Sequence, residues 1–217
     1  MTAVTSSFDL FETMAYLPGY GLRNEAAHIA RLSASAVSLF GLALDGNDVR
    51  SMLRRSLAGI CQQRRVRLTL RSTGELAVEL GPVPDAPSRP VRLEVDAEPV
   101  SSDSVWLAHK TTRREDYDIR AARHPAADDV LLVNEHGQLT ESTIANLAVR
   151  LGKTWFTPLV TCGCLPGVER ARLVGAGRLT ERAITASDLR ANDGLALVSS
   201  LRGWRNATLV PHSPPAE

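Results

Sequence analysis

The chain has 217 residues, which is long for one domain and short for two, so one globule and two packed lobes are both possible. Its 44% hydrophobic and 23% charged residues are typical of a soluble protein with a core. The net charge of +1 argues against nucleic acid or an anionic membrane as the main partner. Because no apolar run approaches the roughly 20 residues that span a bilayer, and the N-terminus shows no signal pattern, we expect a cytoplasmic protein.

The three cysteines predict no disulfide framework and no metal site. Cys61, Cys162 and Cys164 are odd in number and lack framework spacing, as expected of a reducing compartment. The pair Cys162 and Cys164 is one residue short of a C-x-x-C motif, and no histidine lies near it in the sequence. We therefore expect structural cysteines.

The first half of the chain predicts two helices among antiparallel strands. Apolar residues at helical spacing follow Asn24, a good N-cap, as far as residues 40–41, and a second helix is predicted from Asp45 to about Cys61. The proline-rich stretch 81–90 reads as a loop or an edge. Alternation of apolar and polar residues predicts strands at 8–16, 66–71, 76–80 and 91–95, the middle two forming a hairpin.

The second half is richer in strands. Residues 105–108 read as extended, residues 113–123 as a helix, and residues 168–174 as a helix that Gly175 ends. Strands are predicted at 129–133, 139–141, 144–149 and 154–157, with a last strand and turn from 184–189 and 194–198. Residues 1–7 read as loose, and the tail from Pro211 as disordered. The pattern predicts an α+β fold in two lobes, a smaller one at 1–98 and a larger one at 99–217.

Lys110 is the residue around which the chemistry is expected to be organised. The chain holds only two lysines, Lys110 and Lys153, among its 25 basic residues. An amine can lose its proton and attack a carbonyl as a Schiff-base nucleophile, which a guanidinium cannot do. The alternative is a surface ammonium that closes a strand.

Further candidates lie where loops meet helices or strands end. Residues 165–170 place backbone N–H groups at a helix start, where the helix dipole favours a phosphate. Residues 199–203 offer hydroxyls, amides and a guanidinium after a buried strand, although serine and glycine are also ordinary turn residues. Glu141 stands beside apolar neighbours and needs a partner unless it is solvated, and Arg31 is by default a surface charge.

The order of these motifs resembles a known family. An Arg-Leu-x-x-Ser-Ala helix, a lone lysine, Glu-Ser-Thr-x-x-Asn, Leu-Pro-Gly-x-x-Arg and Ser-Ser-Leu-Arg follow one another along the chain. This order, from about Phe8 to Trp204, is similar to the class IV fold of pyridoxal-phosphate (PLP) enzymes, which includes branched-chain and D-amino acid aminotransferases and 4-amino-4-deoxychorismate lyase. Residues 109–113 and 134–146 look most like the lyases, including those fused to the synthase subunit.

The resemblance implies a role for each motif. Lys110 would bond covalently to the cofactor aldehyde and later shuttle a proton, and Glu141 would accept a hydrogen bond from the pyridinium nitrogen. Arg31, the amides of Val168 and Glu169, and Ser199 and Ser200 would hold the cofactor phosphate, while Arg202, Arg113 and Arg114 would face substrate carboxylates.

Two departures from the family pattern bear on function. The chain lacks roughly the first two dozen residues usual in stand-alone members, so we expect a shortened N-terminal lobe in a D-amino acid aminotransferase-like fold. Glu115 stands where aminotransferases place a tyrosine, five residues after the lysine, and Tyr117 is out of register. The second departure favours a lyase over a transaminase.

The function that the resemblance implies is PLP-dependent conversion of 4-amino-4-deoxychorismate to 4-aminobenzoate and pyruvate, for folate biosynthesis. A branched-chain or D-amino acid aminotransferase is the alternative. A third possibility is a non-catalytic interaction partner of the synthase subunit. We also expect a homodimer, because class IV members usually dimerise.

Overall fold

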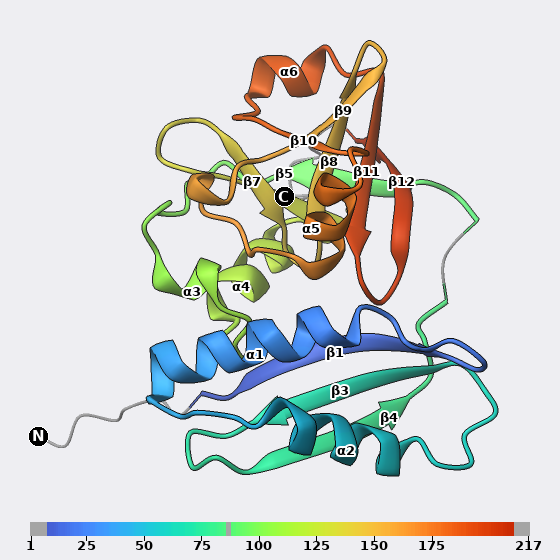
Figure 1. The fold of residues 1–217 in the computed structure, drawn as a ribbon. Helices are drawn as coiled ribbons and strands as arrows, with labels where there is room; N and C mark the ends of the chain where they lie inside the picture. The colour runs from blue at the N-terminus through green and yellow to red at the C-terminus, as the bar shows by residue number, and fades with distance from the viewer. Residues whose placement is uncertain (1–7, 86–87, 211–217) are drawn as a thin grey trace, which may run out of the picture. The chain divides into compact units, whose positions relative to one another are not determined.

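The chain folds into two compact units, and the predicted α+β class is confirmed. A computed structural model describes residues 8–85 and 88–210 (Figure 1). The first unit comprises Met1–Pro84 with His109–Arg113, and the second comprises Asp85–Ala108 with Arg114–Glu217. The predicted loose ends, residues 1–7 and the tail from Pro211, lie outside the described residues. None of the described helices is long and apolar enough to cross a membrane.

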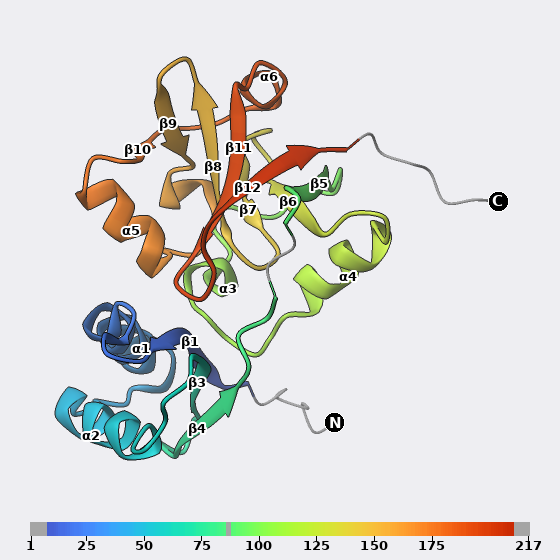
Figure 2. The ribbon, with the colours of Figure 1, turned by 90° about the vertical axis from the view of Figure 1, so that its right-hand side faces the viewer.

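The first unit is an antiparallel sheet with two helices on one face. The sheet order is β2-β1-β3-β4, and helices α1 (Glu25–Phe40) and α2 (Gly46–Ser56) cover the same side of it (Figures 1 and 2). Alternate residues of the strands face these helices and form the core, with Leu10 and Met14 of β1 opposite Leu70 and Val66 of β3. The strands are β1 (Leu10–Leu17), β2 (Gly21–Leu22), β3 (Arg64–Leu70) and β4 (Leu76–Gly81).

The helix boundaries of the first unit agree only in part with those predicted from the sequence. Asn24 precedes α1 as predicted, but its φ is 57° and its side chain makes no capping hydrogen bond. Asp45 caps α2 by accepting a hydrogen bond from the Asn47 N–H. The predicted end of α2 near Cys61 was wrong, because the helix stops at Ser56 and the chain then turns through Gly59 at a φ of 75°.

The second unit is built on an eight-stranded mixed sheet of order β10-β9-β8-β11-β12-β5-β6-β7. One face carries the main core, which extends over β5, β6, β8 and β11, and the other face carries a smaller core with α5 (Figure 2). The strands are β5 (Val91–Val95), β6 (Asp129–Val133), β7 (Leu139–Ser142), β8 (Asn146–Leu151), β9 (Thr154–Thr157), β10 (Thr180–Glu181), β11 (Gly194–Ser199) and β12 (Gly203–Leu209). The helices are α3 (Val105–Ala108), α4 (Glu115–Arg123), α5 (Val168–Gly175), α6 (Ala186–Arg190) and the 3-10 turn η1 (Val160–Cys162).

Three local predictions for this unit were wrong. Residues 105–108 form the single-turn helix α3 rather than an extended segment, because four apolar residues are too few to show a period. Residues 186–190 form α6, which Thr185 and Asp188 cap reciprocally. Strand β12 was not predicted, and it completes the sheet by pairing with β11 on one side and β5 on the other.

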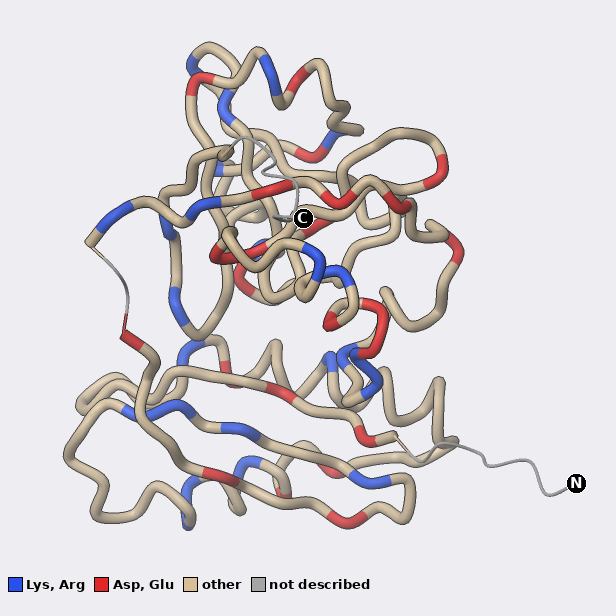
Figure 3. Tube along the Cα trace, turned by 180° about the vertical axis from the view of Figure 1, so that it is seen from behind, with Lys and Arg blue, Asp and Glu red and all other residues tan. Residues whose placement is uncertain are grey.

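The two contact-defined units differ from the expected division at residue 98 in two segments. Residues 85–98 belong to the second unit because β5 pairs in parallel with β6 and β12. Residues 109–113 belong to the first unit because they pair with β1. Acidic and basic residues are interspersed along the trace in both units (Figure 3), as the near-zero net charge leads one to expect.

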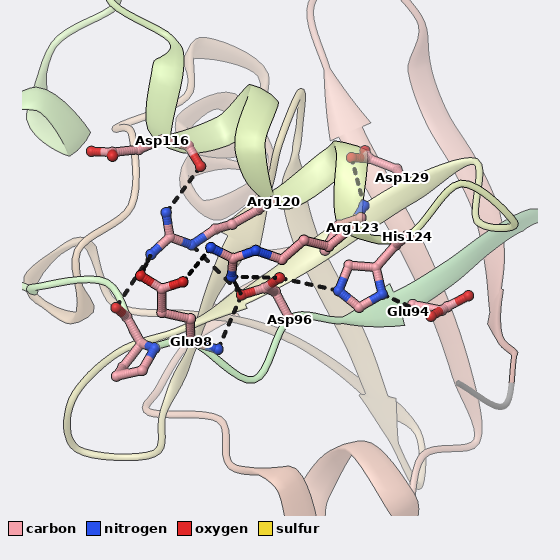
Figure 4. A network of polar contacts seen from close by, with 10 residues as sticks. Glu94, Asp96, Glu98, Asp116, Arg120, Arg123, His124 and Asp129 are labelled. Atoms are coloured by element: carbon pink, nitrogen blue, oxygen red, sulfur yellow. Dashed lines mark hydrogen bonds and ion pairs between the residues drawn. The ribbon is translucent and has the colours of Figure 1, made fainter. Parts of the chain in front are cut away.

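A buried charge network fastens α4 to the end of β5 (Figure 4). His124, directly after α4, places Nδ1 2.8 Å from the Glu94 carboxylate and Nε2 3.1 Å from the Asp96 carboxylate. All three side chains are at least nine-tenths buried, and Arg123 adds a hydrogen bond to Asp96. The contacts with the His124 ring and the hydrogen bond from Arg123 offset part of the cost of burying two carboxylates.

Removing this histidine should therefore destabilise the fold strongly. We expect His124→Ala to lower the free energy of unfolding by about 3 kcal/mol, because it leaves two buried carboxylates short of a partner. The measurement is urea unfolding followed by circular dichroism. His136→Ala is the control, since that ring is 66% exposed beside Glu135, and its effect should stay below about 0.5 kcal/mol. Equal effects in the two variants would contradict the structural role of the network.

Candidate functional site

Lys110 is anchored to β1 through the backbone on both sides. The Phe11 N–H donates to the Lys110 carbonyl at 3.0 Å, and the Thr112 N–H donates to the Asp9 carbonyl at 2.8 Å. The Lys110 side chain is half-buried, with Nζ 4.6 Å from the centre of the Phe11 ring. The lysine is thus held at the edge of the sheet in a defined position, unlike a solvated ammonium at a strand end.

His109 ties the same segment to helix α1. Its Nδ1 lies 2.9 Å from the Ser35 hydroxyl, 74 residues away in the sequence. Burial lowers the pKa of His109, which favours the neutral ring at pH 7. The residue next to Lys110 therefore adds no second positive charge at that pH. No role for His109 was predicted from the sequence.

Arg31 is fixed by a buried carboxylate. Its Nε and one terminal nitrogen donate to the two oxygens of Glu12, at 2.8 and 2.5 Å, and His28 Nδ1 lies 2.7 Å from Glu12 Oε2. The Glu12 side chain is 1% exposed, and that of Arg31 is 12% exposed. A two-point contact holds the plane of the guanidinium, so Arg31 has a set orientation rather than the mobility of a surface charge.

The sequence held a signal for Glu12 that was missed. Glu12 alternates with Leu10 and Met14 along β1, so the strand period places its carboxylate on the core face. A carboxylate in that position needs charged or hydrogen-bonding partners. Burial alone would raise the pKa of Glu12, but the Arg31 charge and the hydrogen bonds from His28 and Arg31 hold that pKa below its ordinary value.

In the second unit, Glu141 of β7 is held by two donors. The Tyr117 hydroxyl donates to Oε1 at 2.9 Å, and the Asn146 amide donates to Oε2 at 3.3 Å. Glu141 is 4% exposed. Burial and then the Glu141 charge raise the pKa of Tyr117, so its hydroxyl stays a proton donor. Tyr117 is out of register with the tyrosine of the family pattern, and its contact with Glu141 was not predicted from the sequence.

The turn after Glu141 is anchored by Asp129 of β6. The Ser142 and Thr143 hydroxyls each donate to one Asp129 oxygen at 2.6 Å. Burial raises the pKa of Asp129, although these hydrogen bonds and the Val130 amide oppose the shift. Both hydroxyls of the Glu-Ser-Thr motif thus serve to fix the strand end that carries Glu141.

The start of α5 has the form that the sequence predicted. Gly167 precedes the helix in extended conformation and, having no side chain, does not cap the first turn, to which Val168 and Glu169 belong. The Glu169 carboxylate turns away to pair with Arg172 at 2.8 Å. The buried Arg170 donates to the Pro158 carbonyl at 2.6 Å and so ties the helix to the preceding loop.

The β11–β12 turn carries Ser199, Ser200 and Arg202. The Ser199 hydroxyl accepts a hydrogen bond from the Arg202 N–H at 3.3 Å, and Ser200 is buried. Among the described residues, neither the Arg202 nor the Arg205 guanidinium has a hydrogen-bond or ion-pair partner. Burial, and then the charge of Arg202, lowers the pKa of Arg205.

The remaining candidates differ in their surroundings. Arg114 donates to the Thr143 carbonyl at 2.7 Å and lies over the Tyr117 ring at 4.8 Å, whereas Arg113 is exposed. Cys164 is buried, and burial followed by the Glu141 charge raises its pKa to about 12, so its thiol stays neutral. The first unit holds Lys110, Arg31 and Arg113; the second holds Glu141, Val168, Glu169, Ser199, Ser200, Arg202 and Arg114.

Comparison with known proteins gives the class to which this fold and these residues belong. Residues 9–210 match the amino-transferase class IV family, so the chain belongs to that family. Its members are PLP-dependent enzymes, aminotransferases or lyases, and the resemblance inferred from the motifs is confirmed.

The individual relatives carry both kinds of name. A Schizosaccharomyces pombe protein with the provisional name aminodeoxychorismate lyase is 32% identical over 179 residues, which are 80% of this chain and 76% of that protein. A crystal structure from Mesorhizobium loti, provisionally named an amino-acid aminotransferase, is 35% identical with a TM-score of 0.86, covering 94% of this chain and 100% of that one. A Legionella pneumophila structure with the provisional name 4-amino-4-deoxychorismate lyase shares the fold, at 23% identity and a TM-score of 0.83 over 93% of this chain and 82% of that one.

The Glu12 contacts predict that the loss of stability caused by a Glu12 substitution depends on pH. Because the pKa of Glu12 is lowered in the folded state, its stabilisation is complete above its ordinary pKa of 4.5 and is lost as the pH falls through the lowered value. We expect Glu12→Gln to lose about 3 kcal/mol of unfolding free energy at pH 7, and the gap to wild type to narrow below pH 4. Urea unfolding at several pH values measures both effects.

The control for this experiment is Glu75→Gln. Glu75 pairs with Arg71 at the surface, where both side chains are 58% exposed, so its loss should cost well under 1 kcal/mol at any pH. A Glu12→Gln gap that stays constant down to pH 3 would contradict the linkage between Glu12 ionisation and stability.

Proposed function

We propose that this chain is a PLP-dependent lyase that converts 4-amino-4-deoxychorismate to 4-aminobenzoate and pyruvate. The cofactor half of the proposal is carried by the buried Glu141 carboxylate, whose two oxygens are fixed by Tyr117 and Asn146. Each carboxylate oxygen can accept more than one hydrogen bond, so Glu141 keeps the capacity to accept one from a ring nitrogen. The lyase half is supported by the name of the Schizosaccharomyces pombe relative.

The residues present fit PLP in charge and donor type. The Arg31 guanidinium, already oriented by Glu12, suits a phosphate, and so do backbone amides at a helix start, such as those of Val168 and Glu169. Ser199 and Ser200 would complete the phosphate contacts. When bound, PLP supplies an aldehyde that takes up a primary amine and a ring that stabilises carbanion charge.

Lys110 would carry the proton transfers of the reaction. Its amine would take the proton from the substrate ring carbon that bears the amino group, and would return a proton to the methylene carbon of the departing enolpyruvyl group. Every substrate atom then appears in 4-aminobenzoate or pyruvate, so neither water nor an oxidant is consumed. The neutral His109 beside Lys110 avoids a second positive charge that would oppose protonation of the amine.

The position of the nearby tyrosine favours a lyase over a transaminase. Transaminases of the class place a tyrosine five residues after the lysine, where this chain has the exposed Glu115. The hydroxyl of Tyr117 is already committed to Glu141. An aminotransferase remains the second candidate, because the Mesorhizobium loti structure carries that name. A non-catalytic partner of the synthase subunit is the third.

The setting of the reaction follows from the same proposal. We place the lyase in folate biosynthesis in the cytoplasm, as a homodimer that receives its substrate from aminodeoxychorismate synthase.

The first test is product formation by the PLP-loaded protein. The substrate is generated in place from chorismate and glutamine by a synthase, and pyruvate and 4-aminobenzoate are followed separately. Lys110→Ala should lower the rate by about 10³-fold, because both proton transfers lose their carrier. Lys153→Ala, which removes the exposed second lysine, should leave the rate unchanged.

Other outcomes of this assay select among the candidates. If neither product forms but an amino acid bleaches the visible band of bound PLP and a keto acid restores it, the protein is an aminotransferase. A colourless protein that takes up no added PLP contradicts both enzyme assignments and leaves the interaction protein.

We expect Arg202 to bind a carboxylate of the substrate. We expect Arg202→Gln to raise KM about tenfold with little change in kcat, because a charge-assisted hydrogen bond is lost from bound substrate and transition state alike. The same variant should weaken binding of 4-aminobenzoate but not of 4-aminobenzamide, which lacks the carboxylate. Arg190→Gln, at an exposed position, is the control. Equal weakening of both ligands would rule out a contact with the carboxylate.

A further inference from the structure

Asn146 connects two groups that the proposed function assigns to opposite ends of the cofactor. It is the first residue of β8, is 5% exposed and pairs with Val198 of β11, directly before Ser199. Its side-chain nitrogen donates to the Leu165 carbonyl at 2.9 Å and to Glu141 at 3.3 Å. One amide thus contacts both the ring-nitrogen acceptor and the turn that begins α5.

The other side of the Asn146 amide lies against Gly167. A Cβ atom added to Gly167 would lie 1.7 Å from Asn146 Oδ1 and 2.9 Å from Asn146 Cγ. The backbone of Gly167 has a φ of −64° and a ψ of 133°, which any residue can adopt, so space rather than conformation requires glycine here. The Leu165–Gly167 turn therefore packs directly against the Asn146 side chain.

The chemistry of these contacts selects an amide. The nitrogen faces two acceptors, a carbonyl and a carboxylate, and both of its N–H groups are used. An aspartate of the same shape would place an oxygen against both acceptors. An alanine would leave the Leu165 carbonyl and Glu141 without this donor and would open space beneath Gly167.

We propose that Asn146 is a positioning residue that sets the spacing between the Glu141 carboxylate and the amides at the start of α5. This inference rests on the proposed binding of PLP, whose ring nitrogen and phosphate would be bound by those two groups. A ligand that spans both groups gains affinity from their fixed spacing, because less ordering is needed on binding. A ligand without the phosphate gains nothing from it.

The test compares PLP with pyridoxal, which lacks the phosphate. The dissociation constant of pyridoxal divided by that of PLP, both measured by absorbance titration, reports how much the phosphate adds to the affinity. We expect Asn146→Ala to reduce this ratio at least about tenfold, and Asn146→Asp to reduce it further. A residue that only stabilised the fold would weaken both ligands in proportion and leave the ratio unchanged.

Asn134 provides a matched control in the same unit. It is also a buried asparagine beside a strand end, and its side-chain nitrogen donates to the Cys162 carbonyl at 3.0 Å and to Gln138 at 2.9 Å. Asn134→Ala should therefore destabilise the protein while preserving the ratio. A ratio that falls equally in both variants, or that Asn146→Ala leaves intact, overturns the inference.

A second measurement tests the geometry without any cofactor. Gly167→Ala should lower the urea midpoint strongly in the wild-type background, and much less when Asn146→Ala has removed the atom that its Cβ would meet. If Gly167→Ala gives no folded protein, recovery of folded protein in the double variant is the expected result. An equal drop of the urea midpoint in both backgrounds would contradict the packing of the turn against Asn146.

Different results would contradict the proposed function and the positioning role of Asn146. Wild-type protein that binds neither PLP nor pyridoxal overturns the proposed function, and the role of Asn146 toward the cofactor with it. Wild-type protein that binds PLP, with a ratio insensitive to Asn146, overturns the positioning role alone.

Discussion

Burying a carboxylate costs free energy unless both of its oxygens are hydrogen-bonded, and this constraint organises both units. Glu12 is met by Arg31 and His28, Asp129 by Ser142 and Thr143, and Glu141 by Tyr117 and Asn146. In each case the partner comes from another element, so satisfying the charge also fixes one element against another. Among the side chains proposed to bind the cofactor, Arg31 is thus held as the partner of a buried charge, and Glu141 is itself such a charge.

The arginines of the β11–β12 hairpin are arranged in the opposite way. Arg202 and Arg205 have no carboxylate within ion-pair distance among the described residues, and burial, followed by the charge of Arg202, lowers the pKa of Arg205. Two guanidinium groups that repel each other and lack partners favour an incoming anion. Guanidinium groups without a carboxylate partner suit an anionic ligand, which agrees with a proposed substrate that carries carboxylates.

The network at His124 shows the same constraint away from the proposed chemistry. Its two carboxylates, Glu94 and Asp96, lie at the end of β5, and they are contacted by Arg123 of α4 and by His124, the next residue (Figure 4). Helix α4 also carries Tyr117, whose hydroxyl holds Glu141. The packing of α4 against β5 through buried charged groups therefore also affects the position of the Glu141 carboxylate.

The sequence by itself determined the elements with a sustained period and the motifs that mark the family. Helix α1 and strands β3, β5 and β6 follow from apolar spacing, and the motif order that indicates the family makes Lys110 and Glu141 candidate site residues, because both signals are local. Helix α6, strand β12 and the contacts of Glu12 and Tyr117 were not predicted. Only the tertiary structure decided them: β12 is completed by strands on both sides, Tyr117 reaches Glu141 across 24 residues, and Asn146 reaches Leu165 across 19. Such contacts depend on how distant segments pack, and no local pattern of residues records that packing.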